Sequence, residues 1–246
     1  YLFDLNNHYY KLIIMISQYL TDEFFYILYF ILATSIYTFV DRKLTNVYEG
    51  RYYLLHSINN AVITYCTYPA VIYSYTNLET FNEYERSIVA PVLTAALHTY
   101  HIIEYKEKLT YYDYIHHGSM CMIALPLGLY VNSGALLDHS LFYITGVPGM
   151  IDYMMMFLVR NKKVKKMTQK NINTNINLWL RCPGCVSLST LTTVVYVNSS
   201  NLIFDEIQSV MVIAIIFLVY WNGVYFMNLV VRDYAQQQII AGRKLE

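Results

Sequence analysis

The sequence predicts an all-α polytopic membrane protein with about seven transmembrane helices. Two observations lead to this fold class. Hydrophobic residues make up 56% of the 246 positions and charged residues only 14%, whereas a soluble domain carries about 25% charged residues. The charges also lie between apolar runs of about 17 to 25 residues, and a helix needs about 20 apolar residues to span a bilayer. A bilayer can bury seven such runs, whereas a soluble fold of this length cannot.

The individual spans follow from the apolar runs and from the residues that interrupt them. In chain order we expect them at 24–40, 52–75, 88–105, 114–131, 136–159, 176–197 and 207–231. The earlier apolar stretch 12–20 is too short to span a membrane, and Asp22 and Glu23 end it. We expect this stretch to be interfacial or to pack on the bundle. Within the sixth span, Pro183 predicts a helix kink flanked by buried thiols.

The basic residues predict how the spans are oriented. Of the 17 Lys and Arg residues, Lys11 and Arg86 fall on one side of the predicted membrane, Arg181 falls within a span, and the other 14 fall on the opposite side. Basic loops are typically cytoplasmic, so we expect a cytoplasmic C-terminus. The net charge of zero gives no general attraction for nucleic acid, and no nucleic-acid partner is expected.

Polar side chains within the spans predict a functional site, because burying ionisable groups in a membrane is costly. Several follow helical spacing, as His98, His101 and Glu104 do along the third span. With the predicted orientation, the groups in the cytoplasmic half are His56, Asn60, His98, His101, Glu104, His116, His117, Asp152 and Arg181. We expect them to line a cavity that opens toward the cytoplasm. The alternative is that they only form hydrogen bonds between packed helices.

Three chemistries fit such a set of groups. A histidine beside a carboxylate acts as a general base, several histidines bind a metal ion such as zinc or iron, and titratable groups also relay protons or bind a lipid headgroup. Asp113 precedes His117 by four residues, a spacing that lets the carboxylate select one imidazole tautomer. His116 and His117 project about 100° apart on a helix. We therefore expect one ring to face the cavity and the other to face a neighbouring helix.

Five segments of the chain follow the order of a known family. They are LLHSINN around His56, LHTYHIIEY at 97–105, YYDYIHHGSM at 111–120, LWLRCPG at 178–184 and YWNGVYFMNLV at 220–230. Together they resemble the TLC domain, which TRAM proteins and ceramide synthases share. The histidine pair that opens a span after a loop with tyrosines and an aspartate is the most specific of these features.

The resemblance implies a six-helix TLC-like barrel at 45–235. Residues 1–44 then form an interfacial segment and a first transmembrane helix, and 236–246 form a cytoplasmic tail. In ceramide synthases similar histidines serve acyl transfer from acyl-CoA, which implies catalytic roles for His116 and His117, with Asp113 and Asp152 as acidic partners. However, Asp113 lies closer to the pair than in those enzymes, and GVPGMID at 146–152 replaces a His-Asp pair. The broader TLC type therefore matches better than a full ceramide synthase.

We therefore expect a lipid-handling membrane protein that acts in acyl-CoA-dependent acyl transfer to a lipid amine, or in lipid binding or sensing. Membrane lipids are the expected partners, acyl-CoA is the co-substrate, and no resident cofactor or metal is expected. The endoplasmic reticulum is the expected location, with the mitochondrial inner membrane as the alternative. The alternative function is a non-catalytic structural subunit of a larger membrane assembly. Fatty-acid elongases also have seven spans, but Ile102 stands where their histidine box requires a further histidine.

Overall fold

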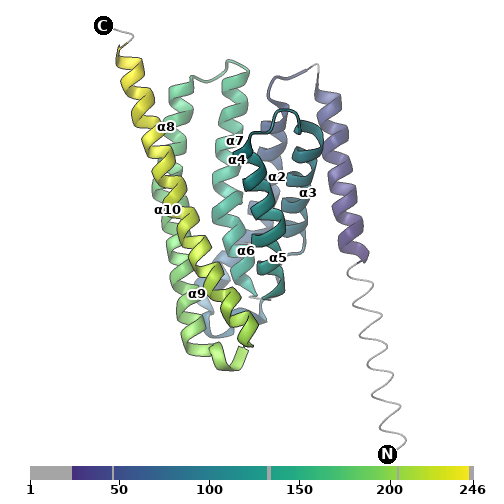
Figure 1. The fold of residues 1–246 in the computed structure, drawn as a ribbon, viewed down its shortest axis with the longest axis vertical. Coiled ribbons are helices and arrows are strands. Elements are labelled where there is room, and N and C mark those ends of the chain that lie inside the picture. The colour runs from purple at the N-terminus through teal and green to yellow at the C-terminus, as the bar shows by residue number, and fades with distance from the viewer. Residues whose placement is uncertain (1–23, 46, 132–133, 204, 244–246) are drawn as a thin grey trace, which may run out of the picture.

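The computed structural model describes residues 24–45, 47–131, 134–203 and 205–243, and within these ranges the chain is helical with no strand (Figure 1). The predicted all-α class is therefore confirmed. The first helix is Phe24–Leu44. The elements that follow are α2 (Arg51–Thr76), the 3-10 helix η1 (Leu78–Glu83), α3 (Val89–Tyr105), α4 (Tyr111–Ser119), η2 (Met120–Ala124), α5 (Leu125–Tyr130), α6 (Ala135–Leu141), η3 (Phe142–Gly146), α7 (Val147–Arg160), α8 (Lys166–Ile176), η4 (Asn177–Arg181), α9 (Cys182–Ile203) and α10 (Glu206–Arg243). The segment predicted at 12–20 lies outside the described residues.

Four described helices are long and apolar enough to cross a membrane, which indicates a membrane protein. They are Phe24–Leu44, Ala135–Arg160, Lys166–Asn198 and Glu206–Gly242. The other predicted spans fall on α2, on α3 and on the segment from α4 to α5. α3 has only 17 residues, and α2 buries polar side chains such as Asn59 and Asn60. For these three segments a transmembrane position stays a prediction, as do the count of seven and the TLC-like barrel.

The connections between the helices gather at the two ends of the bundle. Residues 47–50, 106–110 and 161–165 lie toward one end, together with the C-terminal end of α10 (upper end in Figure 1). These connections and the residues beside them carry most of the basic side chains. The fold thus gathers positive charge at one end, as the alternating charge pattern requires. The side of a membrane that this end faces stays a prediction.

Two predicted boundaries differ from the structure. The basic loop after the fifth span is shorter than expected, because α8 begins at Lys166 and continues into η4 and α9. Its sequence, KMTQKNINTNI, has no apolar run, so hydrophobicity gives no sign of this helix. The tail expected at 236–246 is helical as far as Arg243, because α10 continues well past the predicted end of the seventh span.

Three of the described helices contain a π-helical turn, in which each backbone bond reaches five residues along the chain instead of four. These turns are η2, η3 and η4, and each is closely followed by a proline, namely Pro126, Pro148 and Pro183. A proline lacks an N–H, and its ring clashes with the carbonyl four residues earlier in a regular α-helix. A wider turn before the proline relieves this conflict. The kink predicted at Pro183 takes this form, and the thiols of Cys182 and Cys185 are free and buried, as predicted.

α2 packs against α3, α6 and α7 and so occupies the middle of its half of the bundle. α7 approaches it closely because Gly149 has no side chain, and a Cβ at this position would lie 2.3 Å from Nδ2 of Asn60. The Ser57 hydroxyl adds a hydrogen bond to the Met150 carbonyl at 2.7 Å. Small residues at such contacts are typical of helix packing in membranes. The α2–α7 contact therefore uses polar and small side chains, and it fixes the relative positions of the two helices.

Gly223→Ala tests the similar close contact between α10 and α9. A Cβ at position 223 would lie 2.7 Å from Cβ of Cys185 and 3.3 Å from Cα of Cys182, and overpacking of this kind costs about 1–3 kcal/mol. We expect a lower unfolding temperature in detergent. Gly118→Ala is the control, because no atom lies within 4 Å of a Cβ there and alanine favours a helix. Equal unfolding temperatures for the two variants would contradict the close contact.

Candidate functional site

Five histidines from three helices meet at one place. This histidine cluster consists of His56 of α2, His98 and His101 of α3, and His116 and His117 of α4. The centroid of the His101 ring lies 5.2 Å from that of His56 and 4.8 Å from that of His117. The centroid of the His98 ring lies 5.0 Å from that of His117 and 5.5 Å from that of His116. The structure thus brings together all five histidines that the sequence placed in one layer of the membrane.

The adjacent residues His116 and His117 both belong to the cluster. Their projection about 100° apart on a helix predicted that only one ring faces the site. In the structure both rings contact His98. They differ in burial, because His117 is only 4% exposed whereas His116 is exposed. The prediction that only one of the two rings faces the site is therefore wrong, because both rings contact His98.

Backbone hydrogen bonds determine the tautomers of two rings. Nδ1 of His98 lies 2.8 Å from the carbonyl oxygen of Thr94, and Nδ1 of His56 lies 2.7 Å from that of Tyr52. A carbonyl oxygen only accepts, so Nδ1 carries the hydrogen in both neutral rings and Nε2 keeps a free lone pair. Nδ1 of His117 is buried and has no hydrogen-bond partner among the described residues. The cluster therefore holds nitrogen lone pairs that the surrounding protein leaves available.

Tyrosine rings pack around the histidine cluster. Tyr52 stacks on His101 with the ring centroids 5.4 Å apart, and Tyr105 meets the same ring edge-on at 5.4 Å. Tyr153 of α7 lies 4.6 Å from His56. Such contacts restrict the rotation of the imidazoles and add to their burial. A part of the large tyrosine content, 27 residues, thus has a place in the wall of the site.

Asp113 helps to cap the N-terminus of α4 instead of orienting a histidine. Its carboxylate accepts hydrogen bonds from the backbone N–H and the hydroxyl of Thr110, both at 2.7 Å, and the two residues form a reciprocal capping box. The described residues show no hydrogen bond between Asp113 and His117, so the tautomer role expected from their spacing is not found. Partial desolvation raises the pKa of Asp113, but the hydrogen bonds from Thr110 outweigh it and hold the pKa below its usual value. The ionised carboxylate still interacts electrostatically with His101 and His117.

Arg181 and Asp152 lie beside the histidine cluster on two other helices. Arg181 ends the π turn η4 and donates a hydrogen bond to Oδ1 of Asn222 at 2.9 Å. Asp152 of α7 accepts a hydrogen bond from Gln169 at 2.7 Å. The Arg181 guanidinium interacts electrostatically with both Asp152 and His116. These two predicted residues therefore lie at the edge of the cluster.

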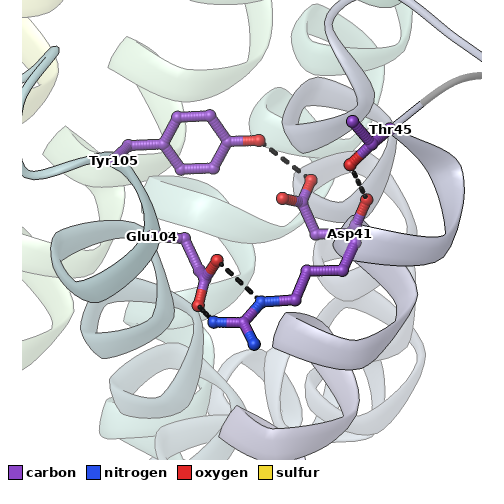
Figure 2. A network of polar contacts seen from close by, with 5 residues as sticks. Asp41, Thr45, Glu104 and Tyr105 are labelled. Atoms are coloured by element: carbon purple, nitrogen blue, oxygen red, sulfur yellow. Dashed lines mark hydrogen bonds and ion pairs between the residues drawn. The ribbon is translucent and has the colours of Figure 1, made fainter.

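Two predicted cavity residues make contacts away from the cluster. Asn60 packs against Gly149 of α7. Glu104 pairs with Arg42 of the first helix, with 2.9 Å between Oε1 and Nη2 (Figure 2). In the sequence, helical spacing puts Asn60 on the same helix face as His56, and Glu104 on the same face as His101. In the structure each of these two side chains contacts another helix. The predicted residues therefore divide into a histidine cluster and a set of helix contacts.

Asp41 is a buried acidic residue that sequence reasoning missed. It is 2% exposed, accepts a hydrogen bond from the Tyr105 hydroxyl at 2.9 Å (Figure 2) and pairs with Arg51 at 2.9 Å. Because Tyr105 also contacts His101, Asp41 links the first helix to the wall of the cluster. Its position beside other charges at the end of a predicted span is typical of a loop residue. Its partners lie far along the chain, so no local spacing indicates its burial.

An apolar cavity of about 210 Å³ is lined in part by residues that follow the histidine pair along the chain. Its wall begins at Ser119, which follows the histidine pair of α4, and at Asn222, the hydrogen-bond partner of Arg181. From there it continues to Val131 and Val212 along α5, α6, α9 and α10. Aliphatic side chains form most of this wall, and the neighbouring charged and titratable groups lie at one end. The site thus joins an apolar space to a polar end.

Asp41→Ala and Glu104→Ala separate the two acidic contacts of the first helix. Asp41 is buried and partnered, so its loss leaves a buried hydroxyl and a guanidinium without their acceptor, at a cost of about 1–3 kcal/mol. Glu104 pairs with Arg42, whose side chain is 71% exposed, and exposed ion pairs contribute at most about 1 kcal/mol. We expect Asp41→Ala to lower the free energy of unfolding in detergent more than Glu104→Ala does. The reverse order would contradict the burial of Asp41.

Comparison with known proteins gives no match. No family model matches it, and neither a curated protein nor a solved structure is significantly similar to it.

Proposed function

We propose that the chain is a lipid-handling membrane protein of the TLC type, which holds an acyl chain in the apolar cavity and presents the polar end of the lipid to the histidine cluster. The observation that carries this proposal is the position of the cavity, whose wall includes Ser119, two residues after the histidine pair of α4, and Asn222, the hydrogen-bond partner of Arg181. The ordered resemblance of five segments supports the TLC type. We also propose a location in the endoplasmic reticulum with the C-terminus in the cytoplasm.

The dimensions of the cavity suit an extended hydrocarbon chain. At about 1.5 Å per helical residue, the wall from Ser119 to Val131 is about 18 Å long. This length exceeds half of the hydrocarbon core of a bilayer, which is about 30 Å thick. Each methylene that moves from water into such a wall contributes about 0.8 kcal/mol. A hydrocarbon chain that arrives from water, such as the acyl chain of acyl-CoA, would therefore gain most of its binding free energy in this cavity.

The polar end of the cavity suits an anionic or nucleophilic group. The Arg181 guanidinium is a good partner for phosphate or carboxylate oxygens, and its buried Nε has no hydrogen-bond partner among the described residues. His116 and His117 precede the cavity-lining Ser119 on the same helix, and histidine is the side chain that most often acts as a general base. Binding of the acyl chain in the cavity would thus place the reactive end of the lipid near a proton acceptor.

In the catalytic form of this proposal the reaction is acyl transfer from acyl-CoA to a lipid amine. The amine nitrogen attacks the thioester carbonyl carbon, a C–N bond forms and the C–S bond breaks. His116 or His117 takes the proton that the amine loses and returns it to the leaving thiolate of coenzyme A. The carboxylate of Asp113 favours the imidazolium electrostatically during this transfer, and Asp152 interacts with the neighbouring Arg181.

Ile216→Trp tests whether the cavity holds a lipid chain. Ile216 lines the cavity, so an indole at this position fills the space that the chain would occupy. Ile213→Trp is the control on the same helix, because Ile213 is 53% exposed on the outside of the bundle. We expect a photoactivatable fatty acyl probe to label the wild type and Ile213→Trp, and to label Ile216→Trp at least about tenfold less, which corresponds to about 1.4 kcal/mol. Equal labelling of both variants would contradict the proposed chain site.

His116→Ala, His117→Ala and the double variant test the catalytic form. We expect acyl-CoA-dependent acylation of lipid amines to fall by about 100-fold or more when the base is lost. His139→Phe is the control, because His139 is a buried histidine of α6 outside the cluster with no hydrogen bond to lose among the described residues. Unchanged turnover in both single variants and in the double variant would contradict the catalytic form and leave lipid binding or sensing.

A structural subunit of a larger membrane assembly is the second candidate function. The exposed aromatic and aliphatic residues on the outside of the bundle favour it, for example Phe24, Tyr65, Trp179 and Phe217. Such a surface suits protein neighbours as well as lipid tails. Purification in a mild detergent separates the two functions: a stable complex with other membrane proteins and no acyl labelling of the cavity would favour the structural subunit.

A further inference from the structure

We infer that His98, His116 and His117 bind one divalent transition-metal ion, with an imidazole nitrogen from each as ligand and one coordination position left open. The three residues come from the last turns of α3 and from α4, two helices that pack together at this point. Each offers one ring nitrogen, and these three nitrogens all lie within 4.8 Å of one another. This inference concerns the histidine cluster alone and does not rest on the proposed lipid chemistry.

The distances between the nitrogens are close to those of a metal site. Zinc binds imidazole nitrogen at about 2.0–2.1 Å in tetrahedral geometry, which places two ligand nitrogens about 3.3 Å apart. Rotation of the side chains can supply the remaining approach. His116 is exposed on one side, and the buried Nδ1 of His117 has no hydrogen bond that such a rotation would break. We therefore expect side-chain rotation to bring the three nitrogens to ligand spacing.

His98 has the hydrogen bonding of a metal ligand. Its Nδ1–H donates to the carbonyl oxygen of Thr94 at 2.8 Å, which leaves the lone pair of Nε2 for an ion. Metal-bound histidines typically donate their other ring N–H to a carbonyl or carboxylate, because this bond fixes both the tautomer and the ring orientation. The Thr94 carbonyl thus holds His98 ready for coordination before any ion arrives.

The unpartnered nitrogen of His117 is the second, independent indication. A buried polar atom without a hydrogen bond costs about 1–3 kcal/mol, so contact with an ion would remove a penalty that helix packing alone leaves in place. His139 provides a contrast, because it is buried with both nitrogens unpartnered among the described residues but has only the tyrosines Tyr75 and Tyr143 as ring neighbours. Within the part of the chain that the structure describes, three such side chains converge at His98, His116 and His117 alone.

The charge around the site also suits a cation. Three neutral imidazoles leave the full charge of a divalent ion to be balanced by other groups. The ionised carboxylate of Asp113 interacts electrostatically with His117 and His116, and the Thr110 hydrogen bonds hold it in this position. Three imidazoles are a ligand set that favours zinc, copper, iron or nickel over magnesium or calcium.

Cobalt and zinc binding by the purified full-length chain in detergent tests this inference. We expect one Co²⁺ per chain, with the visible absorption of a tetrahedral site, and its displacement by one Zn²⁺. His98→Ala, His116→Ala and His117→Ala should each weaken binding by about 100-fold or more, since loss of a partner that only supports a ligand already costs 10–100-fold. His139→Phe should bind both ions as the wild type does.

His117→Cys distinguishes the loss of a metal ligand from a loss of binding through misfolding. A thiolate is also a good zinc and cobalt ligand, so this variant should retain one ion per chain and add a thiolate-to-cobalt charge-transfer band. That band would show direct coordination by residue 117. A wild type without stoichiometric cobalt or zinc would overturn the inference, and so would a wild-type level of binding in the three alanine variants.

The result is independent of the proposed lipid function. An imidazole that ligates an ion has no lone pair with which to accept a proton, so zinc should inhibit acyl transfer that uses His116 or His117 as the base. A chain that binds zinc but acylates nothing when it is assayed free of metal contradicts only the catalytic proposal. A chain that acylates lipid amines but binds neither ion contradicts only the metal site.

Discussion

The close contact between α2 and α7 is the constraint on which the site depends. Gly149 lets the Asn60 side chain lie against the backbone of α7, and the Ser57 hydrogen bond to Met150 fixes the helices along their length. One turn beyond Gly149, Tyr153 then meets His56. Because α2 also packs on α3, this contact positions the first ring of a cluster that continues through α3 to α4.

The polar groups of the bundle serve two distinct purposes, and their hydrogen bonds distinguish them. The Ser57 and Thr64 hydroxyls each donate to a backbone carbonyl at 2.7 Å, which satisfies them within the packed helices. Nδ1 of His117 has no such partner among the described residues. Leaving a buried group unsatisfied costs free energy, and such costs are typical of functional sites. Packing therefore explains the serine and the threonine but does not explain the histidine.

The sequence predicted the class of fold and the five histidines, but not their pairwise contacts. Apolar runs and breakers located the helices, since hydrophobic length is a local property. The rotation of α4 relative to α3 is not a local property of the sequence. Spacing alone therefore could not show that His98 contacts both His116 and His117. Tertiary partners also decided the roles of Asp113, which caps its own helix, and of Asp41, which meets Tyr105 and Arg51. The polar helix α8 lacked the apolar pattern by which the others were found.

The π turns before Pro126, Pro148 and Pro183 have a consequence for how this bundle can vary. A π turn accommodates one residue more than the α-helical turn it replaces, so each of these helices contains a place where the helical phase changes. Removal of one residue there would restore a regular α-helix and leave the residues on either side facing nearly as they do now. In a regular helix the same deletion would turn everything beyond it by about 100°. Insertion or deletion of a single residue, which would ordinarily disrupt the inner face of a transmembrane helix, can therefore be absorbed at these three turns.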